Sequence, residues 1–312
     1  MNWKLKAKIQ NIVALLPSEL SYSLYYWLQR NFGALKTKNI TPVPGLSSGF
    51  EFCSRLMRLN RSPINATFFE IGTGRRLNVP IALWLAGAKK VITLDLNPYL
   101  KSELVKQELG YIRANTAQIQ SLFAGQIYDN RLEKLLDFSG NNWQLPELLN
   151  FCGIDYLAPA DAAMTALPAN SVDYHISYNV FEHISPANLR KILKEAGRII
   201  KPDGMLIHRI DYSDHFAYAD ETISKINFLQ FTDKQWQKIA SNRYMYANRL
   251  RIDDFENLFD CAGYTIISNT PQTDPRSSEL IEKSALALAQ PFASKPKQSL
   301  TAIASWVISR KN

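Results

Sequence analysis

The stretch Thr67-Phe-Phe-Glu-Ile-Gly-Thr-Gly-Arg-Arg76 joins an apolar run to an acid and two glycines that lie one residue apart. A helix-compatible stretch follows from Leu77 to Ala88, and a second apolar run, Val91-Ile-Thr-Leu-Asp95, again ends in an acid. This order predicts a strand, a sharp turn, a helix and a second strand, because glycine permits backbone conformations that other residues avoid. The stretch therefore predicts the first crossover of a parallel sheet.

Two features of this unit indicate a bound nucleoside. Gly72 and Gly74 carry no Cβ, so the turn can approach a ligand closely. Asp95 ends the second strand, where a carboxylate can accept hydrogen bonds from both ribose hydroxyls. Position 77 is Leu, so the third glycine that lets a pyrophosphate approach the helix start is missing. The pattern favours a cofactor without phosphate over a nicotinamide dinucleotide.

The remaining sequence extends this unit to a large α/β domain. Further strands are predicted at 154–158, 172–177 and 204–210, with a helix over 186–200. Two closing strands, 264–268 and 300–309, are separated by a polar, proline-containing segment (271–298) that we predict to be a mobile loop. We therefore predict a Rossmann-like, seven-stranded, mostly parallel sheet with helices on both faces and an antiparallel C-terminal strand.

Three segments lie outside this alternation. Residues 1–62 predict a helical N-terminal extension that caps the main domain, which we place at 63–312. Residues 99–150 predict a helical insertion that shapes a pocket or lid. Residues 211–250 are rich in aromatic and polar side chains and predict a substrate-facing lid region of loops and short helices.

The composition is that of an ordinary globular protein, with 46% hydrophobic and 21% charged residues. No apolar run approaches the roughly 18 residues of a membrane span. Cys53, Cys152 and Cys261 have no metal-binding or disulfide spacing, so we predict small buried residues in a reducing, cytoplasmic compartment. The net charge of +8 is spread along the chain and indicates nucleic acid only weakly.

Residues 1–16 predict a basic amphipathic helix. Its lysines lie beside one apolar face, made by Trp3, Leu5, Ile9, Ile12, Val13 and Leu16. Such a helix can lie on an anionic bilayer, which makes peripheral membrane contact one alternative. The interpretation we favour is a helix packed on its own domain.

Two later stretches complete the pattern. The segment from Leu167 to His183, LPANSVDYHISYNVFEH, is similar to the fourth-strand region of the class I S-adenosylmethionine-dependent methyltransferases. Ile199-Ile-Lys-Pro-Asp-Gly204 resembles the turn before the fifth strand of that family. The resemblance covers residues 66–310 in element order and is closest to the small-molecule, type 11-like branch. It implies that residues 63–312 form a methyltransferase domain.

The resemblance also implies S-adenosylmethionine as the cofactor and a set of residues that bind it. Glu70, Gly72, Gly74 and Asn179 would serve the methionine portion, Asp95 the ribose, Leu96, Asp161 and Ala162 the adenine, and His183 would line the cofactor site. Arg75 and Arg76 depart from the family pattern, since a small residue is common there. Arg76 is either a clamp for an anion or a solvated loop residue.

A polar cluster at and after the predicted fifth strand supplies candidate catalytic residues. Ligands sit beyond the carboxyl ends of parallel strands, so these side chains could face a methyl acceptor. His215 is our first candidate for a general base, with Asp211 and His208 next. Their spacing matches no known metal site, so we predict no metal.

Together these residues predict a methyltransferase that acts on a small-molecule, sugar or lipid-linked acceptor, with O-methylation favoured. The (Asn/Asp)-Pro-Pro-aromatic motif of nucleic-acid amino-methyltransferases is absent at Tyr178-Asn-Val-Phe181, which argues against DNA. RNA or protein acceptors stay open, as does a non-catalytic binding protein with a cofactor fold. The oligomeric state is not predicted.

Overall fold

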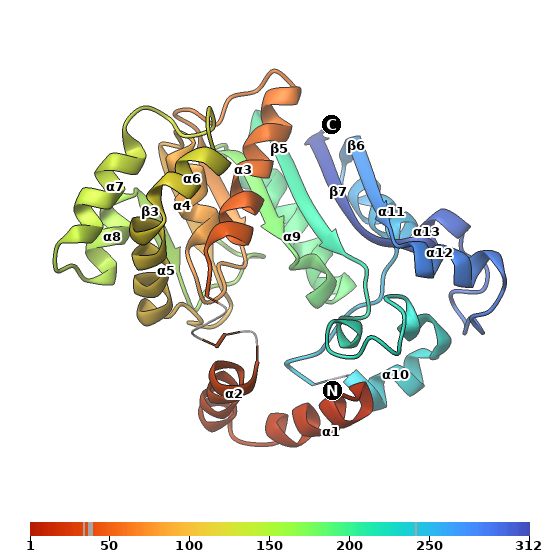
Figure 1. Ribbon diagram of the computed structural model, residues 1–312. Coiled ribbons are helices and arrows are strands. Elements are labelled where there is room, and N and C mark those ends of the chain that lie inside the picture. Colours follow the sequence, from red (N-terminus) through yellow and green to blue (C-terminus); the bar gives the residue numbers. More distant parts are fainter. Residues whose placement is uncertain (34, 37–39, 241) are drawn as a thin grey trace.

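The computed structural model describes residues 1–33, 35–36, 40–240 and 242–312. Seven strands form one sheet in the order β3-β2-β1-β4-β5-β7-β6 (Figure 1). The first five strands in the chain run parallel, and β7 is antiparallel to both β5 and β6. The strands are β1 (Thr67–Ile71), β2 (Lys90–Leu94), β3 (Ile154–Leu157), β4 (Val172–Tyr178), β5 (Ile200–Asp211), β6 (Tyr264–Thr273) and β7 (Ala302–Lys311). The predicted fold class is confirmed.

Helices cover both faces of this sheet, and each face has its own apolar core. The first core joins the inner sides of the strands to α3, α4, α5, α7 and α8, and the second joins them to α9 and α11. These helices are α3 (Val43–Arg58), α4 (Asn78–Leu85), α5 (Ser102–Ala114), α7 (Arg131–Gly140), α8 (Leu145–Phe151), α9 (Pro186–Ile199) and α11 (Ile252–Cys261). Ser185 caps α9 by accepting from the Asn188 N–H, and Pro186 takes the first helical position.

The predicted N-terminal extension divides into two parts. Helix α3 belongs to the sheet core, where a Cβ at Gly49 would lie only 2.5 Å from the Ala82 Cβ on α4. Helices α1 (Trp3–Ala14) and α2 (Ser18–Phe32) instead lie beyond the end of the sheet where β5 finishes (Figure 1). Only α1 and α2 therefore cap the domain.

A third apolar core holds α1 against the segment after β5. The Trp3 ring lies 5.5 Å from Phe216 and 6.0 Å from Phe231. The core also takes in the region before β7. The elements here are the 3-10 turns η3 (His215–Tyr218) and η4 (Asn227–Gln230), and the helices α10 (Asp233–Ala240), α12 (Pro275–Glu282) and α13 (Lys297–Thr301). The predicted mobile loop over 271–298 is thus partly wrong, because Asp274 caps a helix within it by accepting from Ser277 N–H.

The helical insertion at 99–150 is present as α5, α6 (Thr116–Leu122), α7 and α8. Its apolar residues extend the first core beside β3 instead of covering the strand ends, as Leu109 on α5 and Leu135 on α7 illustrate. Only its first residues line a cavity that includes Tyr99 and Lys101. That the insertion shapes a pocket or lid stays a prediction, and residues of α2 also line this cavity.

The burial of the cysteines and the length of the apolar helices can also be compared with the sequence. Cys53 and Cys152 are buried as predicted, whereas Cys261 is exposed near the end of α11. Among the described residues, no helix combines the length and apolar character that a membrane crossing requires.

Candidate active site

The glycine turn after β1 is closed on one side and open on the other. Gly72 has φ +89°, and a Cβ there would lie 2.4 Å from Val180 Cγ2, so no other residue fits. Gly74 has φ +69°, and a Cβ there would meet nothing within 4 Å. The turn therefore leaves open space at Gly74, next to the carboxyl end of β2.

Glu70, the last residue but one of β1, is a buried acid that is 3% exposed. Its Oε2 accepts a hydrogen bond from the Thr93 hydroxyl at 2.6 Å, and that hydroxyl lies 2.6 Å from the Thr73 hydroxyl. Burial raises the pKa of Glu70 to about 8. Glu70 is therefore connected to Thr73 of the glycine turn through Thr93 on β2, and its role toward the cofactor stays a prediction.

This raised pKa leads to a prediction about stability. The folded protein binds the Glu70 proton more tightly than the unfolded chain does, so stability should fall as pH rises between about 5 and 8. Glu70→Gln removes the titrating group. The free energy of unfolding of this variant should therefore decrease by roughly 3 kcal/mol less over that pH range than that of the parent protein. Denaturant unfolding of the unliganded protein at several pH values measures the slope. Equal slopes for the variant and the parent protein would contradict the prediction.

Asp95 joins the end of β2 to the glycine turn. Its carboxylate is 6% exposed, and Oδ2 accepts the Gly74 N–H at 2.9 Å. Burial raises the pKa of Asp95 to about 7, against the opposing hydrogen bond from Gly74. The fold thus brings together Gly72, Gly74 and Asp95, which the sequence separates by the whole of α4. A carboxylate facing an open, Cβ-free turn is the acceptor that the two hydroxyls of a ribose require.

The predicted adenine side lies on the adjoining loops. Ala160 N–H donates to the Asp95 carbonyl at 3.0 Å, which places the 160–164 segment beside the end of β2. Asp161 is exposed, and its Oδ1 accepts the Ala163 N–H at 2.8 Å, while Ala162 is buried. Leu96 is exposed. These residues form one edge around Asp95, although Asp161 already caps its own turn.

Asn179, just after β4, has the left-handed φ of +56° that Asn tolerates well. Its N–H donates to the Arg209 carbonyl at 2.9 Å, and its side-chain oxygen accepts from the Arg209 guanidinium. That guanidinium lies 5.0 Å from the Tyr178 ring. Arg209 therefore positions Asn179, a link between β4 and β5 that the sequence did not indicate.

The two arginines of the turn have separate partners. Arg76 lies 3.2 Å from Glu108, a buried carboxylate that also accepts from Asn78 at 2.9 Å. It is therefore neither a free anion clamp nor a solvated residue. Arg75 instead stacks over the Tyr26 ring at 5.0 Å and donates to Gln29, both on α2.

The candidate base lies beyond the end of β5. His215 Nε2 is 3.4 Å from Asp211 Oδ2. Asp211 is buried and accepts from the Tyr218 hydroxyl and the Ser213 N–H, each at 2.8 Å. Burial pushes the pKa of Asp211 upward, but the His215 imidazole and Ser213 outweigh it and hold that pKa below its ordinary value. Asp211 is therefore a fixed anion beside a half-buried imidazole.

His208 is a correction to the predicted catalytic set. Its ring is fully buried inside the sheet, where Nδ1 lies 2.8 Å from the Ser177 hydroxyl and the ring stacks on Phe181 at 4.2 Å. Burial lowers its pKa well below the ordinary value. Alternation along β5 directs this side chain into the second core. His208 cannot contact an acceptor and is not a candidate base.

His183 lies among the catalytic candidates. Its ring centre is 5.0 Å from that of His215, and its Nδ1 is 2.7 Å from the Tyr246 carbonyl. Glu182, His183 and His215 each offer one potential metal-ligand atom within 4.8 Å of the others. Tetrahedral zinc would need ligand atoms about 3.4 Å apart, whereas Glu182 Oε1 lies 4.0 Å from His183 Nε2. The spacing therefore favours the closer His215–Asp211 pair over a metal centre.

A cavity of about 540 Å³ adjoins the Asp95 loop. Tyrosines and basic side chains from α2, the glycine turn and the β2 loop line it, and none of them was among the predicted catalytic or cofactor-binding residues. The lining residues are Ser18, Glu19, Tyr22, Ser23, Tyr26, Arg75, Asn97, Pro98, Tyr99 and Lys101. This cavity is the candidate space for an acceptor.

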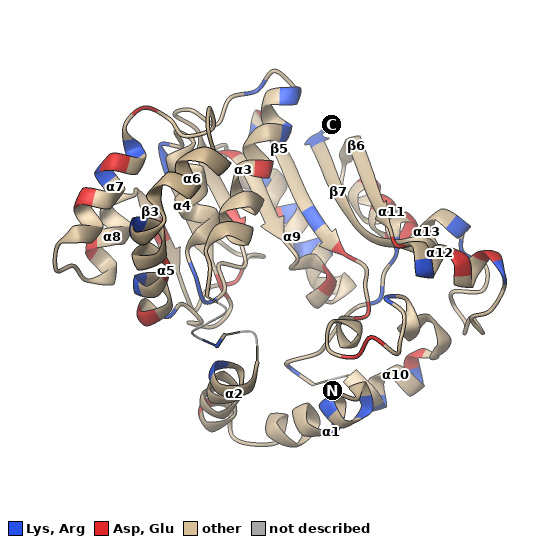
Figure 2. Ribbon diagram, viewed as in Figure 1, with Lys and Arg blue, Asp and Glu red and all other residues tan. Residues whose placement is uncertain are grey.

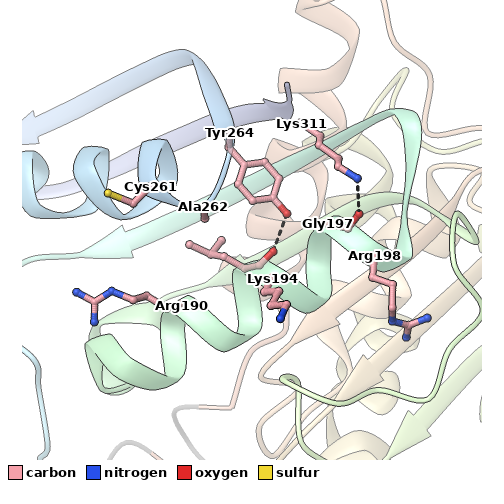
Figure 3. A pocket seen from close by; sticks show the side chains of 9 residues that line it. Arg190, Lys194, Gly197, Arg198, Cys261, Ala262, Tyr264 and Lys311 are labelled. Atoms are coloured by element: carbon pink, nitrogen blue, oxygen red, sulfur yellow. Dashed lines mark hydrogen bonds between the residues drawn. The ribbon is translucent and has the colours of Figure 1, made fainter.

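A second hollow, also about 540 Å³, lies between α9 and the start of β6 (Figure 3). Its basic lining is partly engaged, since Lys311 Nζ donates to the Gly197 carbonyl at 3.0 Å and Arg198 pairs with Glu195 at 2.6 Å. It contains none of the strand-end acids. We therefore assign the site to the cavity beside Asp95.

The comparisons agree with this geometry. Residues 134–208 match the family model described as "Methyltransferase domain". That match spans β3, β4 and most of β5, and the strand order places the glycine turn and Asp95 beside them. The chain therefore carries a methyltransferase domain, as its resemblance to the class I S-adenosylmethionine-dependent methyltransferases implies. The cofactor of this methyltransferase is accordingly S-adenosylmethionine.

Solved structures resemble this methyltransferase at low identity. A geranyl diphosphate methyltransferase in complex with S-adenosylmethionine is 10% identical, with a TM-score of 0.46 and 85% of each chain covered. A protein from Pyrococcus horikoshii is 11% identical, with a TM-score of 0.46, covering 83% of this chain and 88% of its own. A methyltransferase from Methanosarcina mazei is 12% identical, with a TM-score of 0.44 and coverages of 82% and 96%. No curated protein matches the chain.

Proposed function

We propose that this methyltransferase transfers a methyl group to a hydroxyl of a small-molecule, sugar or lipid-linked acceptor in the cytoplasm. The observation that carries the proposal is the pair of His215 Nε2 and Asp211 Oδ2, 3.4 Å apart beyond the end of β5. A hydroxyl needs help to lose its proton, and an imidazole oriented by a buried carboxylate is suited to accept it. The pair lies at the edge of the sheet where ligands of such folds bind.

The residues present fit the cofactor. We assign the ribose to Asp95, the methionine portion to the turn at Gly72 and Gly74 with Asn179, and the adenine to Leu96, Asp161 and Ala162. His183, beside His215, would line the side of the site that faces the acceptor. When bound, S-adenosylmethionine supplies an electrophilic methyl group on a sulfonium. The protein contributes by holding the acceptor oxygen in line and excluding water.

The proton of the acceptor would pass to His215. With the Nε2 side of the ring facing Asp211, the lone pair available for the proton is on Nδ1. The negative Asp211, held by Ser213 and Tyr218, stabilises the resulting imidazolium. This division of roles requires no metal ion.

The cavity beside Asp95 supports the acceptor class. Tyr22, Tyr26 and Tyr99 offer flat apolar rings that suit a sugar or a prenyl-like chain. Arg75 and Lys101 add positive charge over the Tyr26 ring, at 5.0 and 5.3 Å, which suits an acceptor that carries an acidic group.

We predict that His215→Ala lowers turnover at least about tenfold, the low end of what loss of a general base costs. Affinity for S-adenosylhomocysteine, measured by calorimetry, should hold. The assay follows methyl transfer from labelled cofactor to panels of glycosyl, phenolic and polyprenyl-linked acceptors. Unchanged turnover in a folded variant would remove His215 as the base.

Three controls separate this function from its competitors. Lys238→Ala alters an exposed residue of the same lid region and should leave turnover unchanged. Dialysis against a chelator should also leave turnover unchanged, whereas its loss would assign Glu182, His183 and His215 to a metal centre. Binding of S-adenosylhomocysteine without transfer to any acceptor would indicate a binding protein, and transfer confined to RNA or protein would replace the acceptor class.

A further inference from the structure

The exposed apolar surface of this protein is concentrated in its first two helices. Among the described residues, 18 large apolar side chains are exposed, and 10 of them lie within residues 1–32. Single exposed apolar residues are ordinary on protein surfaces, but a contiguous group indicates an interaction site. The ten are Met1, Leu5, Ile9, Ile12, Leu15, Leu16, Leu20, Leu24, Trp27 and Phe32.

Helix α1 is apolar on two opposite sides. One side, which carries Trp3 and Ala7, is buried in the third core. The other side carries Leu5, Ile9 and Ile12 at spacings of four and three residues, and all three are exposed. An ordinary surface helix presents polar residues to water on that side. The predicted single apolar face is therefore wrong in detail, and its packed and exposed residues have separate roles.

Helix α2 repeats this arrangement. Its inner side carries Tyr22, whose ring lies 5.7 Å from Tyr99, and Tyr26, whose hydroxyl donates to Glu103 at 2.5 Å. Its outer side exposes Leu20, Leu24 and Trp27 at helical spacing. The two helices are joined by the Ser21 hydroxyl, which donates to the Val13 carbonyl at 2.7 Å. We call the exposed apolar residues on the outer sides of α1 and α2 the hairpin surface; they are Leu5, Ile9, Ile12, Leu20, Leu24 and Trp27.

The charge around the hairpin surface is positive. Residues 1–33 contain four basic residues and one acidic residue, Glu19. Lys4 and Lys8 are exposed along one flank of the α1 stripe. Figure 2 shows basic positions and no acidic position on α1. Exposed leucines and isoleucines flanked by lysines match the interface of an anionic bilayer, where apolar groups enter the acyl boundary and lysines meet phosphate.

We propose that the hairpin surface docks this methyltransferase onto anionic membranes. A second copy of the chain fits this surface less well, because a two-fold contact would bring the lysines of both copies together. The inner side of α2 lines the cavity beside Asp95, so docking would bring that cavity close to the bilayer. This placement suits a lipid-linked acceptor. The docking proposal itself is argued from the hairpin surface alone and does not depend on the proposed function.

Vesicle co-sedimentation with the full chain tests the proposal. Binding is expected to phosphatidylcholine vesicles that contain about one third phosphatidylglycerol, and it should weaken as salt rises. Replacing Leu5, Ile9 and Ile12 together by Glu should weaken binding at least about tenfold. Lys4→Gln and Lys8→Gln should each weaken it about fivefold.

A matched control replaces three equally exposed apolar residues elsewhere, Met57, Leu122 and Ile267, by Glu and should bind vesicles like the parent protein. Affinity for S-adenosylhomocysteine and the thermal midpoint check that every variant is folded. A blue shift of tryptophan fluorescence on adding vesicles, absent in Trp27→Phe, would place α2 at the interface.

Two results would overturn the proposal. One is no binding to anionic vesicles by the folded parent protein. The other is a dimer in light scattering that the triple Glu variant dissociates while vesicle binding is unaffected, since the hairpin surface would then be a subunit interface. Vesicle binding without methyl transfer would leave the docking intact and remove the proposed function instead.

Discussion

Replacing Asp95 by Ala is expected to weaken binding of S-adenosylhomocysteine about a hundredfold. The physical reason is the loss of two hydrogen bonds from ribose hydroxyls to a carboxylate, each worth about 1.5 kcal/mol when one partner is charged. Asp95 is well placed for them, because it is buried at the end of β2 and accepts the Gly74 N–H at 2.9 Å. Calorimetric titration with S-adenosylhomocysteine measures the effect.

The pH dependence of this affinity provides an independent check. Burial raises the pKa of Asp95 to about 7, so the unliganded carboxyl is partly protonated near neutral pH. Because the carboxylate is the better acceptor, affinity should rise as pH increases through that pKa and level off above it. Asp95→Asn keeps the size of the side chain and should bind with a flatter pH profile.

A control variant removes an acid from the neighbouring strand. Asp155 on β3 pairs with Lys90 at 2.6 Å at the exposed surface, and Asp155→Ala should leave affinity unchanged. If Asp95→Ala remains folded and binds as tightly as the parent protein, Asp95 does not hold the ribose. The glycine turn would then need another function.

The sequence predicted those parts of the fold that are encoded by residues close together in the chain. β1 and β2 form at the two predicted apolar runs, because each run is buried and lies between turn residues. Gly72 was interpretable because only glycine adopts its φ of +89° beside Val180. Asp95 was identified because one crossover fixes the distance along the chain between the turn and the next strand end.

The rest of the site depends on contacts between distant segments. Tyr26 meets Arg75 because α2 folds over the glycine turn, and no pattern around either residue indicates that meeting. His208 and His215 look equivalent in the sequence, yet strand alternation buries His208 and the turn at η3 leaves His215 beside Asp211. The aromatic content of 211–250 was correctly noted, but part of it forms the core under α1.

Arg251 is the clearest example of a residue whose role depends on contacts between distant segments. Replacing Arg251 by Met should destabilise the protein by at least about 4 kcal/mol. The side chain is fully buried, and its hydrogen bonds to the described residues all go to backbone carbonyl groups. Its guanidinium donates to four carbonyl groups, those of Tyr212 at 2.6 Å, Ser299 at 2.9 Å, Leu300 at 3.1 Å and Ala302. Each buried carbonyl left unpaired costs about 1 kcal/mol or more, a large share of an ordinary stability.

Loss of the Arg251 side chain should also disturb the position of the candidate base. Tyr212 directly follows Asp211, so the Arg251 hydrogen bond to the Tyr212 carbonyl fixes the segment that leads to His215. Arg251→Lys keeps the charge but has fewer donors in another geometry, so it should fall between Met and the parent protein. Arg310→Met, at an exposed position on β7, should change stability by no more than about 0.5 kcal/mol.

Denaturant unfolding measures these differences, and turnover of the folded fraction reports on the site. A folded Arg251→Met protein with parental stability would show that water satisfies the four carbonyl groups. Reduced turnover in Arg251→Lys with unchanged affinity for S-adenosylhomocysteine would instead locate its effect at Asp211 and His215, away from the cofactor. Such a result would link stability to the candidate base through Tyr212, because its carbonyl is the one Arg251 partner that directly follows Asp211.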